Sequence, residues 1–435
     1  MHVLLSAGSN AQGQLGNAST DDSHSFQRCS FLGCEQGVLP AGTSRIVSLS
    51  GGANHTVVLL EVNDTSSDQP RRELWGCGSG LKGQLGPTFS KPTLLKGSSP
   101  VFRPIILPLE QHNLGGRSYK AVCTAWETTY VVLERPGTED AVISMGANDF
   151  GDLGVGGYKQ QEKTLHVINF DHVEIDGHSP KPDTIVVLNL SAGQHHVVGY
   201  LRAVFSDSSL RSFLVGWGSS RHGQLDDLSS DDKRSAAQPF TSKPKLISTS
   251  EDIIGLGLGM QHTVLLHTSR RASGTGSNRK GQLLGLQSLS NVRCVACTWN
   301  GTYAVVDEDP GTWHVVSTGS NTHGQLGRLA HNNVAPSITA VGFPEIIKTR
   351  VLKEIACGSE HVLCLFSTSV ETLGRSVTEV WGWGWNEHGN LGLDTTDDVH
   401  IPVRILPTKQ DNTFYIVDVW AGCGTSWIYG TDAPG

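Results

Sequence analysis

Four histidines at one position of a repeated pattern are the first candidates for chemistry. Each stands three residues after a glycine, and they are His55, His196, His262 and His361. Imidazoles bind metal ions and transfer protons, so four of them would suit a metal centre. If the repeated units form a ring, however, equivalent positions are spread around it. We therefore predict that these histidines are structural, and that each hydrogen-bonds within its own unit and holds a turn.

Cysteines are the second candidates. The chain has nine, of which Cys294 and Cys297 form a lone Cys-x-x-Cys pair. A zinc site needs a second pair, or histidines at ligand spacing, and none follows. We therefore predict no metal site, and we interpret Cys297 and Cys357, which share one repeat position, as small buried core residues. An odd number of cysteines without a signal peptide indicates reduced thiols.

The common catalytic motifs are absent from the sequence. It contains no Gly-x-Ser-x-Gly elbow, no His-Glu-x-x-His and no Gly-Lys-[Ser/Thr] phosphate loop. Catalytic residues in a repeat protein should also depart from the repeat pattern, and the acidic pairs lie in polar stretches instead. We predict no catalytic residues, no cofactor and no enzyme activity.

Two tryptophans do depart from the pattern. Units two and five carry Trp126-Glu127 and Trp299-Asn300 where other units have a small or polar pair before the histidine position. One interpretation is that the indoles pack near the centre of a ring. The other is that they are aromatic anchors on one face, since tryptophan is enriched among residues that dominate binding energy. We take Trp126, Glu127, Trp299 and Asn300 as candidate partner-binding residues.

The elements that must position these residues are themselves repeated. A Gly-x-x-x-x-Gly-[Gln/Asp/Asn]-Leu segment occurs seven times, and its first glycines are at positions 8, 78, 146, 218, 276, 319 and 384. It alternates with the Gly-x-x-His-type segment, and short apolar β-rich runs flank both. Such units cannot bury both faces alone, but they can when packed around a ring. The sequence therefore predicts an all-β, seven-bladed β-propeller that forms a single domain over residues 1–435, with Leu15, Leu85 and their equivalents between neighbouring blades.

The ends of the chain indicate how the ring closes. The last unit ends near the C-terminus, while the chain begins with a strand-like run, Val3 to Ala7, that leads into Gly8. An open ring would expose two sheet edges. We predict that the N-terminal strand pairs beside the C-terminal strand and completes the last blade.

Together the two alternating segments resemble the regulator-of-chromosome-condensation repeat over roughly residues 1–430. Within that superfamily the chain is similar to the fungal alpha-tubulin suppressor proteins. The resemblance implies a non-enzymatic interaction scaffold that binds a small CSL-type zinc protein of diphthamide synthesis. The heterodimer of that family also serves the Elongator complex in modifying wobble uridines of tRNA. The alternative within the superfamily is guanine-nucleotide exchange on a Ran-like small GTPase.

Composition excludes other classes of function. There are 33 Lys and Arg against 41 Asp and Glu, a net charge of −8, and no basic block, so we expect no direct DNA binding. No run of about 18 apolar residues occurs, so we expect no membrane span. The N-terminal apolar run is far shorter than that of a signal peptide. We expect the protein in the cytoplasm and the nucleus.

Overall fold

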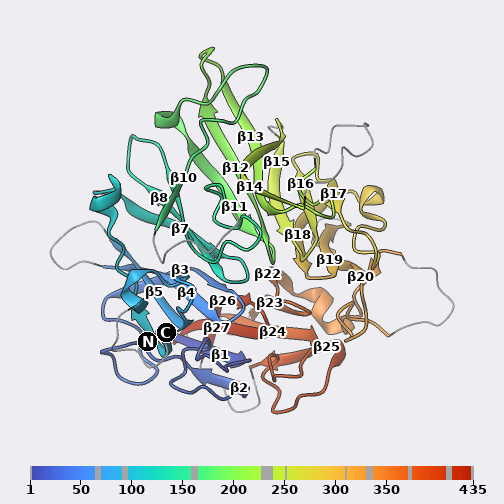
Figure 1. The fold of residues 1–435 in the computed structure, drawn as a ribbon. Coiled ribbons are helices and arrows are strands. Elements are labelled where there is room, and N and C mark those ends of the chain that lie inside the picture. The colour runs from blue at the N-terminus through green and yellow to red at the C-terminus, as the bar shows by residue number, and fades with distance from the viewer. Residues whose placement is uncertain are drawn as a thin grey trace.

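Seven sheets stand side by side around a central axis, and Figure 1 shows them in chain order around the ring. Six sheets have four strands and one has three, as expected for the predicted seven-bladed propeller. The computed structural model describes residues 2–63, 70–90, 97–157, 165–226, 239–249, 252–308, 311–329, 337–370, 375–407 and 414–432.

The first three blades cover residues 43 to 248. Blade 1 comprises β3 (Thr43–Gly51), β4 (His55–Val62), β5 (Arg71–Ser79) and β6 (Ser98–Pro104). Blade 2 comprises β7 (Ser118–Thr124), β8 (Thr128–Glu134), β9 (Ala141–Gly146) and β10 (His166–Ile168). Blade 3 comprises β11 (Val186–Ala192), β12 (His196–Val204), β13 (Leu210–Ser219) and β14 (Phe240–Ser248).

The remaining blades complete the ring. Blade 4 comprises β15 (Ile253–Leu258), β16 (His262–His267) and β17 (Ala272–Gly276), and blade 5 comprises β18 (Val292–Thr298), β19 (Gly301–Asp307), β20 (Trp313–Gly319) and β21 (Thr339–Ala340). Blade 6 comprises β22 (Val351–Cys357), β23 (His361–Val370), β24 (Arg375–Gly384) and β25 (Val399–Leu406). Blade 7 comprises β26 (Phe414–Ala421), β27 (Thr425–Asp432), β1 (His2–Gly8) and β2 (Ser23–Arg28).

Blade 7 is built from both ends of the chain. Its strands lie in the order β2-β1-β27-β26, and β1 pairs antiparallel with β27 from His2 opposite Thr431 to Gly8 opposite Thr425. The two termini are therefore neighbours, as their marks in Figure 1 show. The N-terminal strand occupies the place that the sequence predicted, and it covers what would otherwise be an open edge of β27.

The helical elements are short. The described 3₁₀ helices are η1 (Pro87–Ser90), η3 (Leu109–His112), η4 (Pro182–Thr184), η5 (Leu286–Ser288) and η6 (Glu345–Thr349). Among the described residues, no helix has the length and apolar character that crossing a bilayer requires.

The Gly-x-x-x-x-Gly-Gln-Leu loops hold adjacent blades together. In the first of them the Asn10 side chain accepts the backbone N–H of Leu15 at 2.9 Å, and Leu15 is fully buried. Gly13 has a φ of +80°, and a Cβ there would lie 2.5 Å from the Cα of Pro100. Leu85 packs into one cluster with Leu59 of blade 1 and with residues of blade 2. The prediction that these leucines lie between neighbouring blades is confirmed.

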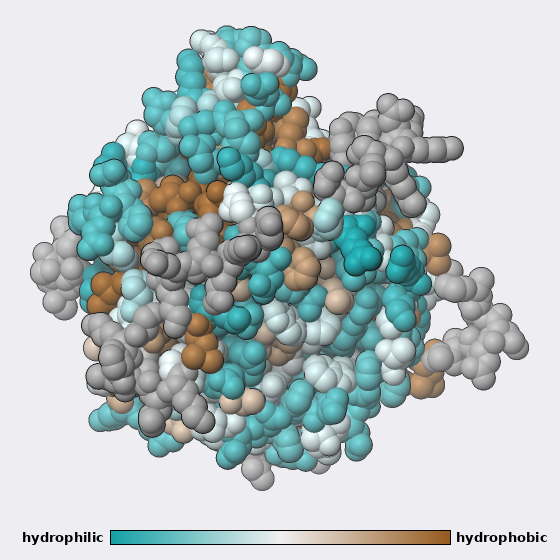
Figure 2. Space-filling model, in the orientation of Figure 1, coloured by the Kyte–Doolittle hydropathy of each residue, from teal (hydrophilic) through white to brown (hydrophobic). Residues whose placement is uncertain are grey.

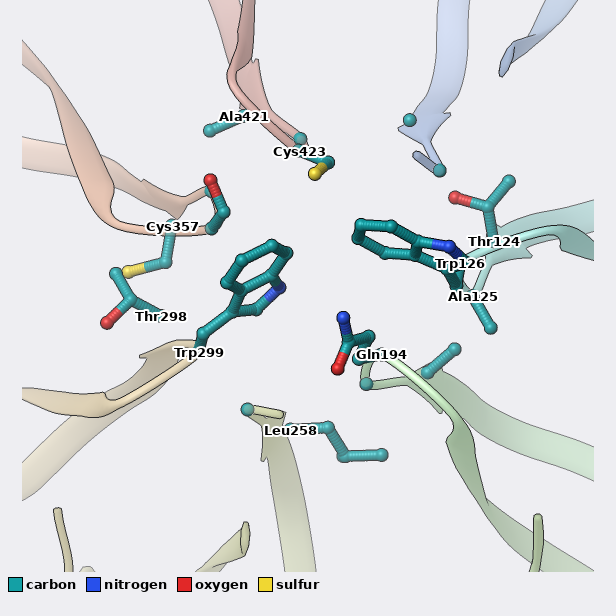
Figure 3. A pocket seen from close by; sticks show the side chains of 18 of the residues that line it. Thr124, Ala125, Trp126, Gln194, Leu258, Thr298, Trp299, Cys357, Ala421 and Cys423 are labelled. Atoms are coloured by element: carbon teal, nitrogen blue, oxygen red, sulfur yellow. The ribbon is translucent and has the colours of Figure 1, made fainter. Parts of the chain in front are cut away.

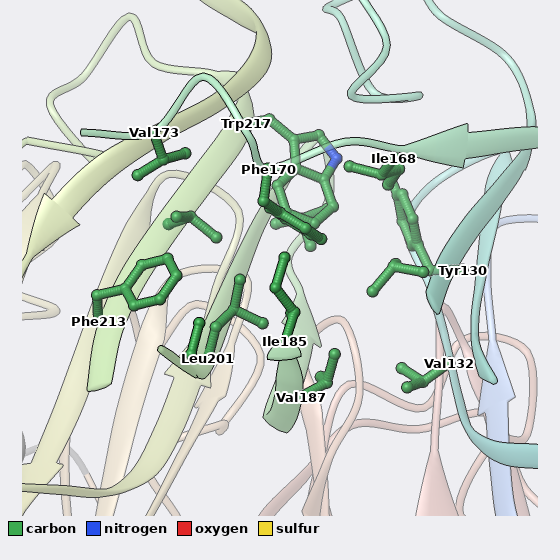
Figure 4. Packing of buried hydrophobic residues seen from close by; sticks show 14 of the residues in the cluster. Tyr130, Val132, Ile168, Phe170, Val173, Ile185, Val187, Leu201, Phe213 and Trp217 are labelled. Atoms are coloured by element: carbon green, nitrogen blue, oxygen red, sulfur yellow. The ribbon is translucent and has the colours of Figure 1, made fainter. Parts of the chain in front are cut away.

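Large apolar clusters fill the spaces between blades. Figure 4 shows the one between blades 2 and 3, where the rings of Tyr130 and Trp217 meet edge to face at 5.9 Å. The Tyr130 hydroxyl and the Trp217 indole N–H both donate to the carbonyl oxygen of Asp152, at 2.6 and 3.0 Å. The buried aromatic pair thereby fixes the loop that carries Asp152.

The distribution of hydrophilic and hydrophobic residues on the surface does not by itself identify a docking site. On the face seen in Figure 2, hydrophilic residues predominate among the described residues, and hydrophobic residues lie in separate patches. Scattered apolar residues are normal on protein surfaces, so a site has to be identified from particular side chains.

Candidate functional site

The two repeated segments lie at the same end of the ring. His55 begins β4 and pairs with Gly78, which lies near the end of β5, and the equivalent pairing places Thr128 opposite Gly146 in blade 2. The turns between the first and second strands therefore lie beside the loops that follow the third strands. We call this end of the ring the turn face.

Backbone hydrogen bonds link the turns of neighbouring blades around the channel. The N–H of Ala53 donates to the carbonyl of Trp126, and the N–H of Trp126 donates to the carbonyl of Gln194, both at 2.8 Å. On the other side of the ring, Met260 donates to Trp299, and Trp299 donates to Ser359, at 3.0 and 2.7 Å. The backbones of Trp126 and Trp299 are thus fixed by both neighbouring blades.

The four repeat histidines connect blades. In each case Nε2 lies within hydrogen-bonding distance of a hydroxyl oxygen in the next blade; the pairs are His55–Thr129 (3.0 Å), His196–Thr263 (3.1 Å), His262–Thr302 (3.1 Å) and His361–Ser426 (3.0 Å). The prediction of a bond within the same blade is therefore wrong, although the structural role fits. Each ring lies over the glycine three residues before it and reaches toward the next blade; a Cβ at Gly52 would lie 2.3 Å from the His55 ring.

Burial keeps these imidazoles neutral. It lowers the pKa of His55 and His196 to about 3, and that of His262 and His361 to about 4. The Nδ1 atoms of all four have no hydrogen-bond partner among the described residues. A proton there would place an unpaired charge in the interior, which is unfavourable.

The two candidate tryptophans meet at the channel axis. Trp126 comes from blade 2 and Trp299 from blade 5, and their ring centroids lie 5.8 Å apart at an interplanar angle of 45°. Both are half-buried. Figure 3 shows the two indoles pointing toward each other across the pocket, with the Gln194 side chain beside them and Cys423 opposite. We call Trp126, Gln194, Trp299 and Cys423 the channel mouth.

The neighbours of the tryptophans have different surroundings. Asn300 donates from its amide to Glu360 at 2.7 Å, and Gln325 donates to the other oxygen of that carboxylate at 2.8 Å. Burial raises the pKa of Glu360, while these two hydrogen bonds oppose the rise. Glu127 is half-buried, and its carboxylate has no ion pair or hydrogen bond among the described residues. Asn300 thus positions Glu360, whereas no described side chain holds the carboxylate of Glu127.

Sequence reasoning missed three residues of this surface. The His195 ring lies 6.2 Å from Trp126 and 4.6 Å from Phe150, and its Nδ1 is 3.2 Å from the Asp152 carboxylate. Phe150 is 41% exposed, so the aromatic row from Phe150 through His195 to Trp126 reaches solvent. Gln194 completes the mouth. The sequence contained one indication of this surface: Asp152, which contacts His195, stands where most units have glutamine.

Beneath the indoles is a small cavity of about 150 Å³. Cys297, Cys357 and Cys423 line it. Cys297 and Cys357 share the repeat position just before the glycine of the Gly-x-x-His-type segment, so this position faces the channel. Burial raises the pKa of Cys297 and Cys423 to about 12. Cys297 is buried as predicted; Cys357 is half-buried, lines the same cavity and packs against the apolar cluster between blades 5 and 6. Among the described residues, no three His, Cys, Asp or Glu side chains are arranged to hold a metal ion; the predicted absence of metal stays a prediction.

Comparisons with known proteins agree with this architecture. Residues 379–428 match the Regulator of chromosome condensation (RCC1) repeat. The chain is 26% identical over 464 residues to the secretion-regulating guanine nucleotide exchange factor of Bos taurus, covering 97% of this chain and 81% of that protein. It is 24% identical to an RCC1 repeat-containing protein of Schizosaccharomyces pombe, covering 98% of each.

Among solved structures, Prp20p of Saccharomyces cerevisiae superposes with a TM-score of 0.71 at 16% identity, covering 100% of this chain and 92% of that one. This likeness and the seven sheets define a seven-bladed β-propeller. The chain is similar to RCC1-type propellers in one repeat, over most of its length and in fold.

Proposed function

We propose that this protein is a non-enzymatic scaffold that binds a protein partner through the channel mouth on the turn face. The observation that carries the proposal is the Trp126–Trp299 pair. Blades 2 and 5 each place an indole at the axis, where the two touch and remain half-buried. Aromatic side chains that combine a rigid apolar ring with a polar N–H are typical anchors of protein interfaces.

The indole N–H groups support this role. Six other tryptophans of the chain donate to a protein acceptor; they are Trp75, Trp217, Trp313, Trp381, Trp383 and Trp385. Within the described ranges no hydrogen bond is formed by the N–H of Trp126 or Trp299, nor by that of Trp427, which is fully buried. Trp126 and Trp299 differ from Trp427 in being only half-buried, so their N–H groups can donate to a carbonyl or carboxylate of a docked protein.

The proposed partner is a small CSL-type zinc protein. The resemblance to the fungal alpha-tubulin suppressor proteins supports it, and with it roles in diphthamide formation on elongation factor 2 and in Elongator-dependent tRNA wobble-uridine modification. The match to the fission-yeast repeat protein over 98% of both chains is consistent with a fungal protein of this architecture. On this proposal the protein acts in the cytoplasm and the nucleus.

The second candidate function is guanine-nucleotide exchange on a Ran-like small GTPase. It is favoured by the similarity to the bovine secretion-regulating guanine nucleotide exchange factor over 97% of this chain. It gains support from Prp20p, a protein described with its binding to Gsp1p and histones. Both candidates use a propeller face as a docking surface, and neither requires a catalytic residue in this chain.

Affinity purification from the native host, followed by mass spectrometry, separates the candidates. Recovery of a CSL-type zinc protein supports the first proposal, and recovery of a Ran-like GTPase supports the second. A nucleotide-release assay on the GTPase is the companion measurement: faster release with the propeller added would establish exchange. Recovery of neither protein, with no effect on release, contradicts both.

A further inference from the structure

Two neighbouring loops of the turn face carry a group of cationic side chains. Arg221 and His222 belong to the loop after β13, and Arg279 and Lys280 belong to the loop after β17. We call these four residues the cationic arc. Arg221, Arg279 and Lys280 are exposed, and His222 is half-buried. None of them forms an ion pair with another described residue.

The two loops are joined, so the four side chains form one surface. The Thr275 hydroxyl of blade 4 donates to the carbonyl of Gly223 in the blade 3 loop at 2.8 Å. Positive charge on Arg221 and Arg279 lowers the pKa of His222, together with the larger effect of burial. Arg279 therefore acts across the boundary between blades on the loop of its neighbour.

The arc continues inward to the channel mouth. Ser219 and Ser277, at the base of the two loops, donate their backbone N–H to His195 and Gln261 in the turns around the channel, at 2.6 and 2.8 Å. On the side toward blade 5, the Thr302 hydroxyl donates to the carbonyl oxygen of Gln282 in the blade 4 loop at 2.6 Å. Thr302 lies three residues after Trp299, so this hydrogen bond links the blade 4 loop to the strand that follows the Trp299 turn.

The opposite sign of charge lies on the adjoining blade. Glu127 follows Trp126 in the chain and Asp149 lies in the loop after β9 of the same blade, and neither carboxylate has a cationic partner among the described residues. Arg221 and Arg279 form no ion pair with another described residue, whereas the charge of Lys280 also acts on the Glu360 carboxylate. The chain as a whole carries a net charge of −8, so this group of cations stands out against it. A mouth with cations on one side and carboxylates on the other can orient a charged partner, because complementary charges attract and like charges repel.

From this arrangement we propose that the protein partner docks with an acidic surface over Arg221, Arg279 and Lys280 while an apolar group contacts the Trp126–Trp299 pair. This inference rests on the proposed scaffold function and specifies the chemistry of its partner. The carboxylates of Glu127 and Asp149 would repel an acidic surface placed over blade 2, which disfavours the reversed orientation. Charges at the rim act mainly on the association rate, and the indoles act mainly on dissociation.

A matched pair of lysines tests the proposal. Lys280 and Lys82 occupy the same repeat position in different loops, and each donates its backbone N–H to the following glutamine side chain, at 2.8 and 2.9 Å. Binding of the purified CSL-type zinc protein, and separately of the Ran-like GTPase, is measured by surface plasmon resonance at low and physiological salt. The variants are Lys280→Glu with Lys82→Glu as its matched control, the double variant Arg279→Glu, Lys280→Glu, and Trp299→Ala.

We expect the Arg279→Glu, Lys280→Glu variant to bind at least about tenfold more weakly, mainly through slower association and most clearly at low salt. Lys82→Glu should change affinity less than about twofold and clearly less than Lys280→Glu, which makes the same change of charge within the arc. Equal losses in Lys280→Glu and Lys82→Glu would mean that only net charge matters, and that outcome overturns the proposal.

The remaining outcomes separate the inference from the function on which it rests. If Trp299→Ala abolishes binding but the charge reversal does not weaken it, the scaffold function stands and the acidic partner surface is wrong. If neither protein binds the wild type, the scaffold function and the inference both fail. If a tRNA anticodon stem-loop binds through Lys280 while neither protein depends on it, the arc is a nucleic-acid site, and the proposal is wrong.

Discussion

Lowering the pH from 7 to 5 should destabilise this propeller through its four buried histidines. The Thr263 hydroxyl donates its single proton to the carbonyl of Gln224, so it must accept from Nε2 of His196. Thr302 fixes His262 in the same way through Gln282. In these two histidines the proton of the neutral imidazole is therefore on Nε2. In all four, a second proton would enter at a buried Nδ1 that has no partner among the described residues.

Whether stability rises or falls with pH depends on which state, folded or unfolded, binds the proton more tightly. The folded pKa values are about 3 for His55 and His196 and about 4 for His262 and His361, below the ordinary 6.5. The unfolded chain therefore takes up protons first, and stability that is complete above pH 6.5 is lost as the pH falls. From pH 7 to 5 each histidine costs about 2 kcal/mol, and four cost on the order of 8 kcal/mol. That is comparable to the whole stability of a typical domain, about 5–15 kcal/mol.

Buried carboxyl groups act in the opposite direction, because burial raises the pKa values of Glu354, Asp418 and Glu360. Burial, together with nearby Asp418, raises the pKa of Glu354 to about 7. The folded state then binds this proton more readily than the unfolded state, which favours folding as the pH falls. The pH dependence of the wild-type unfolding free energy is the sum of these opposing effects. The difference in pH dependence between variants is therefore more informative.

Urea unfolding followed by tryptophan fluorescence at pH 7, 6 and 5 measures the effect. His196→Thr installs the residue that blades 2 and 7 carry at this position, as Thr128 and Thr425. Its unfolding free energy should fall less steeply between pH 7 and 5, by about 2 kcal/mol. His24→Gln, at an exposed histidine, is the control and should leave the slope unchanged. An identical slope in wild type and His196→Thr would refute the reasoning.

Three further predictions concern the fold and its thiols. Deletion of residues 1–7 removes β1 from blade 7 and exposes β27, so the melting temperature should fall sharply and the protein should aggregate; a truncated protein that melts like the wild type contradicts the closure. Elemental analysis should find no stoichiometric zinc or iron; about one metal per chain, lost in a Cys294→Ser, Cys297→Ser double variant, would overturn this. Because burial raises the pKa of Cys297 and Cys423 to about 12, neither should react with iodoacetamide at pH 8 in the native state; rapid labelling of either would show that the channel opens.

The repeat could be read from the sequence because its spacing reflects local requirements. Glycines at positive φ and a leucine that enters the gap between blades recur wherever the same loop is built, as at Gly13 and Leu15. Closure followed from the same logic, since a missing strand at one end of the chain matched a spare strand at the other. Local pattern thus determined most of the fold.

Contacts across blades were not accessible in the same way. The hydroxyl partner of His55 is Thr129, 74 residues later, and the repeat shows that both positions recur but not that they face each other. Trp126 and Trp299 stand out as departures from the pattern, yet their contact depends on the width of the channel. Phe150 and His195 occupy variable positions of their segments, where no periodic signal separates a site residue from an ordinary loop residue.

The central claim is that the channel mouth binds a protein partner, and one pair of measurements on Trp126→Ala and Trp299→Ala tests it most directly. Partner affinity by titration calorimetry and melting temperature are recorded on the same samples, with Trp126→Phe to keep the ring and remove the N–H. We predict near wild-type melting and a loss of about 2 kcal/mol or more of binding, roughly 30-fold, for both alanine variants. A lower melting temperature that corresponds to a loss of about 3–5 kcal/mol of unfolding free energy, with unchanged partner affinity, would instead make both tryptophans core residues and contradict the claim.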